Sequence, residues 1–75
     1  MSRIMVRTEA LIQARVYKGL TQKELASRIG VSPAYISLIE RGEKSVGPAT
    51  AKRICETLDL QWQQLFSLNS TTPQN

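Results

Sequence analysis

The chain has 75 residues, which is enough for one small domain and near the lower size limit for folding without disulfides or metals. Its single cysteine excludes an internal disulfide and fits a reducing compartment, and the lack of histidine leaves almost no ligands for a transition metal. The formal net charge of +4 favours an anionic partner such as nucleic acid. No apolar run approaches the roughly 20 residues of a membrane helix, so we expect a cytoplasmic protein. With 41% hydrophobic but only 5% aromatic residues, its core is expected to consist of aliphatic side chains on helices.

The first segment, residues 1–7 (MSRIMVR), combines two arginines with large apolar side chains and shows no clear periodicity. One interpretation is a basic N-terminal arm that reaches a DNA groove, as homeodomain arms do. The other is a frayed start in which Ile4 or Val6 packs on the domain. We favour the second interpretation.

A first helix is predicted at residues 9–18. Thr8 is a good N-cap, because its side-chain oxygen can accept a hydrogen bond from a backbone N–H of the first turn. Leu11 and Ala14 are expected to face the core, and Gly19 is expected to end the helix.

Residues 21–42, TQKELASRIGVSPAYISLIERG, carry two sets of helix start and stop signals. Thr21 and Glu24 have the spacing of a capping box, in which each side chain accepts from the backbone N–H of the other. Gly30 can adopt the positive φ with which many helices end. These signals predict a short helix between Thr21 and Gly30.

A second helix is predicted to start directly after this turn. Ser32 is its N-cap and Pro33 its first residue, where the missing proline N–H costs nothing, and Gly42 ends it. Two short helices joined by a tight turn form a helix-turn-helix. The inward faces of the two helices are expected to consist of Leu25, Ala26, Ile29, Ile36 and Ile39.

A fourth helix is predicted at residues 48–58, with Gly47 as N-cap and Pro48 as its first residue. Cys55 is expected to be a small hydrophobic core residue and not a reactive thiol or a metal ligand. The buried face of this helix is expected to consist of Ala51, Ile54, Cys55 and Leu58.

A short fifth helix is predicted at residues 61–67, followed by a polar tail at residues 69–75 that we expect to be disordered. Trp62 and Phe66 are four residues apart and would lie on one face of this helix. They either close the core or stay exposed as a dimer contact.

The pattern T-Q-x-E-L-A-x-x-x-G-V-S-x-x-x-I-S-x-x-E-R-G resembles the Cro/phage-repressor class of helix-turn-helix regulators, also called the XRE family. The resemblance extends over about residues 15–65. It implies an all-α, five-helix, lambda-repressor-like DNA-binding domain at residues 8–68, with the helix-turn-helix at the second and third helices. The N-terminal arm at residues 1–7 and the tail at residues 69–75 would flank this domain.

The resemblance also assigns a structural ion pair. Arg15 lies at the place in the first helix where the family has an arginine that pairs with the glutamate matching Glu40. This pair would tie the first helix to the end of the third.

The family's mode of DNA binding places the third helix in the major groove. Gln22 would hold a phosphate and brace a base-contacting neighbour, and Ser32 would contact a phosphate. The residues that would face bases are Pro33, Ala34, Ser37 and Leu38.

Relatives often carry Gln, Lys, Arg or Asn at the places of Pro33, Ala34 and Leu38, so the chain departs from the family here. Of the predicted base contacts, only Ser37 can hydrogen-bond a base edge, and serine discriminates poorly between bases. Direct readout would then rest on thymine methyl contacts, with a share of indirect readout through DNA shape. The alternative is low specificity, or specificity from Arg41 and the N-terminal arm.

Further contacts with the DNA backbone are expected around the motif. Tyr35 is predicted to be half-buried, with a hydroxyl free to reach a phosphate. The cationic phosphate contacts are expected to be Lys23, Arg28, Arg41 and Lys44.

The sequence contains no nucleophile–base set and no glycine-rich phosphate loop, so we expect no enzyme, no cofactor and no metal. The predicted partner is double-stranded DNA. The predicted function is that of a small transcriptional regulator, a repressor of phage or mobile-element type that acts as a homodimer on a palindromic operator, with Trp62 and Phe66 as candidate dimer contacts. The alternative is an antitoxin or adaptor that uses the same fold mainly for protein–protein interaction.

Overall fold

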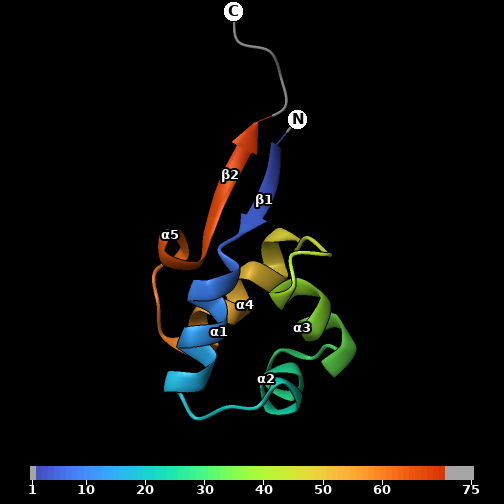
Figure 1. Ribbon diagram of the computed structural model, residues 1–75. Coiled ribbons are helices and arrows are strands. Elements are labelled where there is room, and N and C mark those ends of the chain that lie inside the picture. The colour runs from blue at the N-terminus through green and yellow to red at the C-terminus, as the bar shows by residue number, and fades with distance from the viewer. Residues whose placement is uncertain (1, 71–75) are drawn as a thin grey trace, which may run out of the picture.

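A computed structural model describes residues 2–70 of the chain, and this part contains five helices and one two-stranded sheet (Figure 1). The five-helix fold expected from the sequence is confirmed, and the small sheet is an addition to it. None of the helices in the described residues has the length and apolar content needed to cross a bilayer. In chain order the elements are β1 (Ser2–Val6), α1 (Thr8–Tyr17), α2 (Gln22–Ile29), α3 (Pro33–Glu40), α4 (Pro48–Leu58), α5 (Trp62–Leu65) and β2 (Phe66–Ser70).

The starts of α2 and α3 follow the local signals in the sequence. Thr21 Oγ1 accepts from the Glu24 N–H at 3.0 Å, and Glu24 Oε1 accepts from the Thr21 N–H at 2.9 Å, which completes the capping box. Ser32 Oγ accepts from the Tyr35 N–H at 3.2 Å and caps α3. Gly30 ends α2 with φ 77°, a conformation that a side chain would oppose.

The start of α1 differs from the prediction. Thr8 is the first helical residue, and the N-cap is Arg7, which makes no side-chain cap. Arg7 is extended because it continues the β1 pairing: its N–H donates to the Leu65 carbonyl at 2.8 Å, while its own carbonyl accepts from the Leu11 N–H at 2.9 Å. The strand therefore runs directly into the helix.

The core is aliphatic, as expected, with one aromatic ring. Cys55 is buried among these side chains, and burial, with a smaller contribution from Glu56, raises the pKa of its thiol. The core residues come from every helix, from both connecting segments of the helix-turn-helix region and from β2: Leu11, Leu20, Leu25, Ala26, Ile29, Ile36, Ile39, Val46, Ala51, Ile54, Cys55, Leu58, Leu65 and Phe66.

The N-terminal segment is neither a free arm nor a frayed start. β1 pairs with β2 in antiparallel register, with Ile4 opposite Leu68 and Val6 opposite Phe66, and the hairpin rises from the helical body (Figure 1). Since side chains alternate along a strand, these apolar residues share one face of the sheet. Ile4 and Val6 pack against the core, in agreement with part of the favoured interpretation.

The C-terminal segment also differs from the prediction. The fifth helix ends at Leu65, and Phe66 is extended, with φ −139° and ψ 162°. The strand directs the Phe66 ring into the core, where it is 0% exposed and lies 5.6 Å from the half-buried Trp62 ring, centroid to centroid. Phe66 is therefore not available as a dimer contact. Of the predicted polar tail, residues 69–70 end β2, and residues 71–75 lie outside the described part.

Candidate nucleic-acid interface

The α2–turn–α3 unit is held by its turn and by its buried face. The Val31 N–H donates to the Ala26 carbonyl at 3.0 Å and closes the turn after Gly30. Ile36 and Ile39 are completely buried, and this fixes which side of α3 faces the protein. The unit therefore presents the opposite side of α3 at the surface.

The predicted base-contacting residues lie on this outer side. Pro33 and Ala34 are exposed, and Ser37 and Leu38 are half-buried. Ser32, the N-cap, is exposed at the start of the helix. The structure brings these residues together on one turn-and-a-half of α3, where they form a small surface with hydroxyl and methyl groups.

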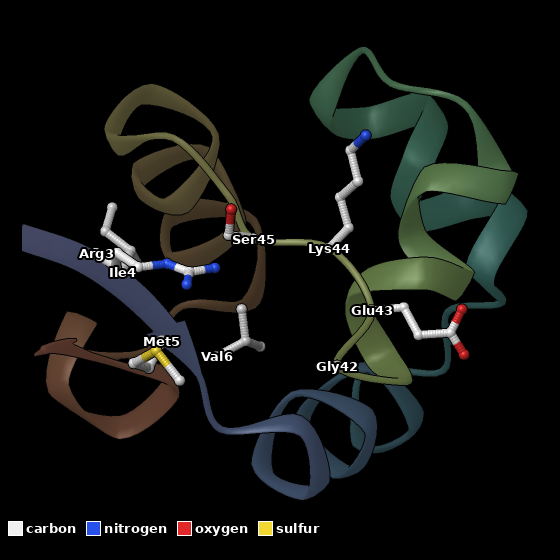
Figure 2. A pocket seen from close by; sticks show the side chains of 8 residues that line it. All are labelled: Arg3, Ile4, Met5, Val6, Gly42, Glu43, Lys44 and Ser45. Carbon is white, nitrogen blue, oxygen red and sulfur yellow. The ribbon is translucent and has the colours of Figure 1, made fainter.

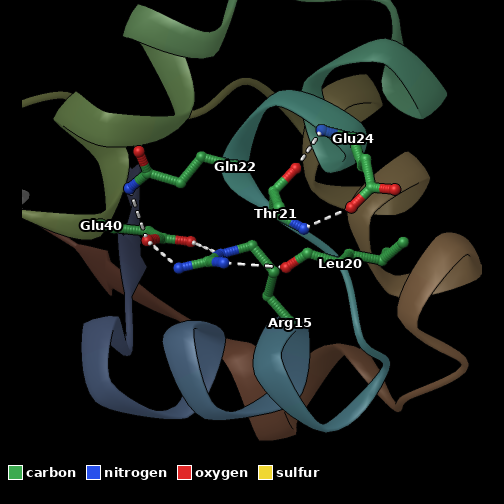
Figure 3. Close-up of polar contacts among 6 residues, drawn as sticks. All are labelled: Arg15, Leu20, Thr21, Gln22, Glu24 and Glu40. Atoms are coloured by element: carbon green, nitrogen blue, oxygen red, sulfur yellow. Dashed lines mark hydrogen bonds and ion pairs between the residues drawn. The ribbon is translucent and has the colours of Figure 1, made fainter.

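A carboxylate at the end of α3 joins three helices (Figure 3). Arg15 of α1 donates from Nε to Glu40 Oε2 at 2.7 Å and from Nη2 to Oε1 at 3.1 Å. Gln22 of α2 donates from Nε2 to the same Oε1 at 2.9 Å. The side chains of Arg15 and Glu40 are only 13% and 4% exposed, so this pair is well shielded from water.

The same cluster ties the helices to the connecting chain. Arg15 Nη1 donates to the Leu20 carbonyl at 2.9 Å, just before the capping box of α2. No buried side-chain nitrogen or oxygen in the described residues lacks a partner. The network therefore fixes the position of α3 relative to α1 and α2 without leaving a buried polar group unsatisfied.

The contact of Gln22 with Glu40 limits its predicted role. The amide nitrogen carries two hydrogens, and one of them is donated to Glu40. The amide oxygen can only accept, so it cannot bind a phosphate oxygen. A phosphate contact by Gln22 would therefore use the second hydrogen on Nε2.

The hydroxyl of Tyr35 is not free, in contrast to the prediction. Tyr35 is half-buried, and its hydroxyl donates to the Ser45 carbonyl at 3.1 Å. A phosphate oxygen can only accept, and the hydroxyl has a single hydrogen. Tyr35 instead ties α3 to the loop that precedes α4.

The four predicted cationic contacts are all exposed and lie on α2 or just after α3: Lys23, Arg28, Arg41 and Lys44. Arg41 Nε lies 3.4 Å from Glu43 Oε2, and both side chains are more than half exposed. Such a surface ion pair contributes little, so it presents only a small barrier to a competing phosphate.

Arg3 is a cationic residue near the motif that the sequence analysis did not assign. Figure 2 shows its guanidinium beside the loop of residues 42–45, across a hollow of about 140 Å³. The loop contributes Lys44 to the lining of the same hollow. Residues 3–6 (RIMV) show no clear alternation of polar and apolar side chains, so no strand signal in the sequence marked the hairpin that carries Arg3 here.

The described residues contain no group of three metal-ligating side chains. The described geometry thus consists of a shielded polar cluster that fixes a short helix, an outer helix face with small and apolar groups, and exposed cations on α2 and directly after α3. This is the arrangement by which a protein presents a helix to a DNA groove and binds the phosphates beside it.

Comparison with known proteins gives the same result. The family model described as "Helix-turn-helix" matches residues 11–65. An uncharacterized HTH-type transcriptional regulator of Sinorhizobium fredii, y4dJ, is 34% identical over 56 residues, which cover 75% of this chain and 73% of the relative.

Two solved structures are similar to the fold. The clp gene regulator ClgR from Corynebacterium glutamicum has a TM-score of 0.70 and 38% identity, with coverage of 75% of this chain and 60% of that one. The restriction-modification controller protein C.AhdI from Aeromonas hydrophila has a TM-score of 0.71 and 28% identity, with coverage of 76% and 86%. The chain belongs to the helix-turn-helix family of DNA-binding transcriptional regulators, of the Cro/phage-repressor (XRE) type.

Proposed function

We propose that this regulator is a cytoplasmic repressor of phage or mobile-element type, which binds a palindromic operator as a homodimer with α3 in the major groove. The observation that carries the proposal is the orientation of α3, in which Ile36 and Ile39 are buried while Ala34 is exposed. Repression requires only that the protein occupies its operator, so it is the simplest outcome of this geometry. A two-fold dimer would read half-sites about 34 Å apart and gain affinity from the second contact.

Base recognition would depend on small groups. Ala34 and Leu38 offer methyl groups that fit the C5-methyl of thymine, and the Ser37 hydroxyl can donate to or accept from a base edge. No long polar side chain lies at these positions to make a bidentate base contact. We therefore expect half-sites that contain A·T pairs under α3, with part of the preference set by DNA shape.

The phosphate contacts would supply most of the affinity. The exposed cations lie on α2 (Lys23, Arg28) and directly after α3 (Arg41, Lys44), and each neutralised phosphate contributes about −0.9 to the slope of log K against log salt. Four such contacts give a slope of roughly −3 to −4 for each domain.

The test is a salt-titrated selection from random duplex DNA, followed by binding measurements on the enriched sequence. We expect a palindrome to be enriched. The double variant Arg41→Ala, Lys44→Ala should bind more weakly and lose roughly two units of salt slope for each bound domain, to a similar extent on all sequences. The matched control is Lys52→Ala, Arg53→Ala, which removes two exposed charges from α4 and should leave the slope unchanged.

Equal effects of the two double variants would show that the wrong face has been chosen. Equally weak binding to all duplexes would refute recognition of a specific operator. It would favour the alternative adaptor function, in which the apolar outer face of α3 contacts a protein.

A further inference from the structure

The hairpin has an unpaired edge on each side, and the hydrogen-bond pattern shows which groups lie there. The Arg7 N–H donates to the Leu65 carbonyl at 2.8 Å, so this pair lies in the hydrogen-bonded phase of the antiparallel ladder. Bonded and non-bonded pairs alternate, which makes Met5–Ser67 a bonded pair and Ile4–Leu68 a non-bonded pair. The backbone N–H and C=O of Leu68 therefore point away from β1, to the outer edge of β2.

The two edges differ in their surroundings. Four successive residues of β1, Arg3 to Val6, line the hollow beside the loop of residues 42–45 (Figure 2). Successive strand residues point to opposite faces, so a hollow lined by all four runs along the strand edge. The loop thus covers the edge of β1. Among the described residues, no helix or strand lies along the outer side of β2 in Figure 1, apart from α5 at its start.

The edge of β2 also lacks the features with which proteins block edge-to-edge pairing. Its sequence, FSLNS, contains no charged residue and no proline. Lysine, proline or an inward-pointing charge is the usual protection of an exposed edge. A two-stranded sheet is marginal by itself, and a third and fourth strand would stabilise it.

The hairpin face that packs on the core is exposed to solvent at the end of the hairpin farthest from the helices. Leu68 is 65% exposed, although it lies on the same face as the core residue Phe66. With Ile4 and Trp62 it lines an apolar groove of about 520 Å³ that reaches the start of α4.

We infer that β2 pairs in antiparallel fashion with β2 of a second copy, centred on Leu68, and forms a continuous four-stranded sheet across the dimer. The inference takes the existence of a dimer from the proposed function and adds its interface. The two-fold axis places Leu68 opposite its counterpart and Phe66 opposite Ser70 of the partner strand, so that the outward N–H and C=O groups bond to each other.

Charge supports a second copy as the occupant of this edge. The chain carries a net charge of +4, so most faces of two copies repel each other, but β2 has no charge to oppose its counterpart. The pairing also places the two Leu68 side chains next to each other on one face of the sheet, where each covers apolar surface of the other.

A cysteine scan across the hairpin tests the register. In a bonded antiparallel pair the Cα atoms lie about 5.5 Å apart, within the range of a disulfide, so Leu68→Cys should form an intermolecular disulfide under mild oxidation. Met5→Cys is the matched control, because Met5 is 45% exposed on β1, which would be an outer strand of the four-stranded sheet, and would lie about 14 Å from its counterpart. Equal cross-linking of both variants would overturn the inference.

A positive charge at Leu68, the centre of the proposed β2–β2 pairing, tests dimerisation without the need for oxidation. Leu68→Lys should raise the dimer dissociation constant about a hundredfold in sedimentation equilibrium, because two cations meet and two leucines lose their apolar contact. Met5→Lys adds the same charge to the same hairpin and should leave dimerisation unchanged. Circular dichroism checks that both variants are folded.

The inference and the proposed function can fail separately. In one outcome, the protein selects a palindrome, but its dimer is unaffected by Leu68→Lys and does not cross-link through Leu68→Cys. This result would support the proposed function and refute the β2 interface. A dimer that cross-links at Leu68 but selects no DNA sequence would support the β2 interface and refute recognition of a specific operator. A chain that stays monomeric at every concentration would overturn the inference directly.

Discussion

Replacement of Glu40 by glutamine tests the cluster that positions α3. The variant keeps the size and shape of the side chain but removes its charge, which leaves the Arg15 guanidinium, 13% exposed, without a counter-charge. Three donors converge on the Glu40 carboxylate, from Arg15 Nε, Arg15 Nη2 and Gln22 Nε2. The amide nitrogen of glutamine is itself a donor, so at least one of these three bonds must be lost.

The structure gives the magnitude of the effect. Removal of one partner from a buried ion pair costs about 3–5 kcal/mol, and the residual exposure of Arg15 places the expected loss at the lower end, about 3 kcal/mol. A chain of 75 residues has a free energy of unfolding of roughly 4–11 kcal/mol in total. The melting temperature should therefore fall by roughly 12–24 °C.

Urea denaturation followed by circular dichroism measures the loss of stability. The control is Glu43→Gln, which breaks the exposed pair with Arg41 and should change the free energy of unfolding by less than about 1 kcal/mol. The double variant Arg15→Met, Glu40→Met should regain part of the loss, because it leaves no charge buried alone. If Glu40→Gln costs no more than Glu43→Gln, the cluster does not hold α3 in place.

Three further variants test other parts of the fold, all in the same urea assay. Phe66→Ala should destabilise the domain by about 3–5 kcal/mol because the ring fills the core; a loss below about 1 kcal/mol would place the ring outside it. The hydrogen bond from the Thr21 N–H holds the pKa of Glu24 below its ordinary value of 4.5, so the stabilisation by the charged carboxylate is complete above that value and is lost as the pH falls through the lowered pKa. Glu24→Gln should accordingly be less stable than the parent at neutral pH and equal to it in acid, and a difference that does not depend on pH would refute this. Gly30→Ala should cost about 1–2 kcal/mol from its positive φ alone, since the added Cβ meets no atom within 4 Å, and an unchanged free energy of unfolding would refute this.

The helical part of the fold was predictable because its signals are local. Thr21 and Glu24, and Ser32 and Pro33, specify where α2 and α3 start within a few residues of sequence. The side of α3 that faces the core is also predictable from the sequence, because buried and exposed residues recur at helical spacing between Pro33 and Glu40.

The hairpin was not predictable from such signals, because its strands lie at opposite ends of the chain and have five residues each. The spacing of Trp62 and Phe66 suggested a shared helix face, but the strand pairing with β1 overrides helix propensity from Phe66 onward. The bond from Tyr35 to Ser45 and the N-cap position of Arg7 depend on contacts outside their own helices in the same way.

The central claim is that the outer face of α3 meets DNA, and a single acidic substitution on that face tests it most directly. Ala34→Glu places a negative charge at an exposed position of α3, and Gln63→Glu adds the same charge at an exposed position of α5. Affinity for the selected duplex at fixed salt should fall at least about a hundredfold in Ala34→Glu, since a like charge against phosphate costs several kcal/mol. The affinity of Gln63→Glu should stay within a few-fold of the parent. Equal affinities of the two folded variants would contradict the account.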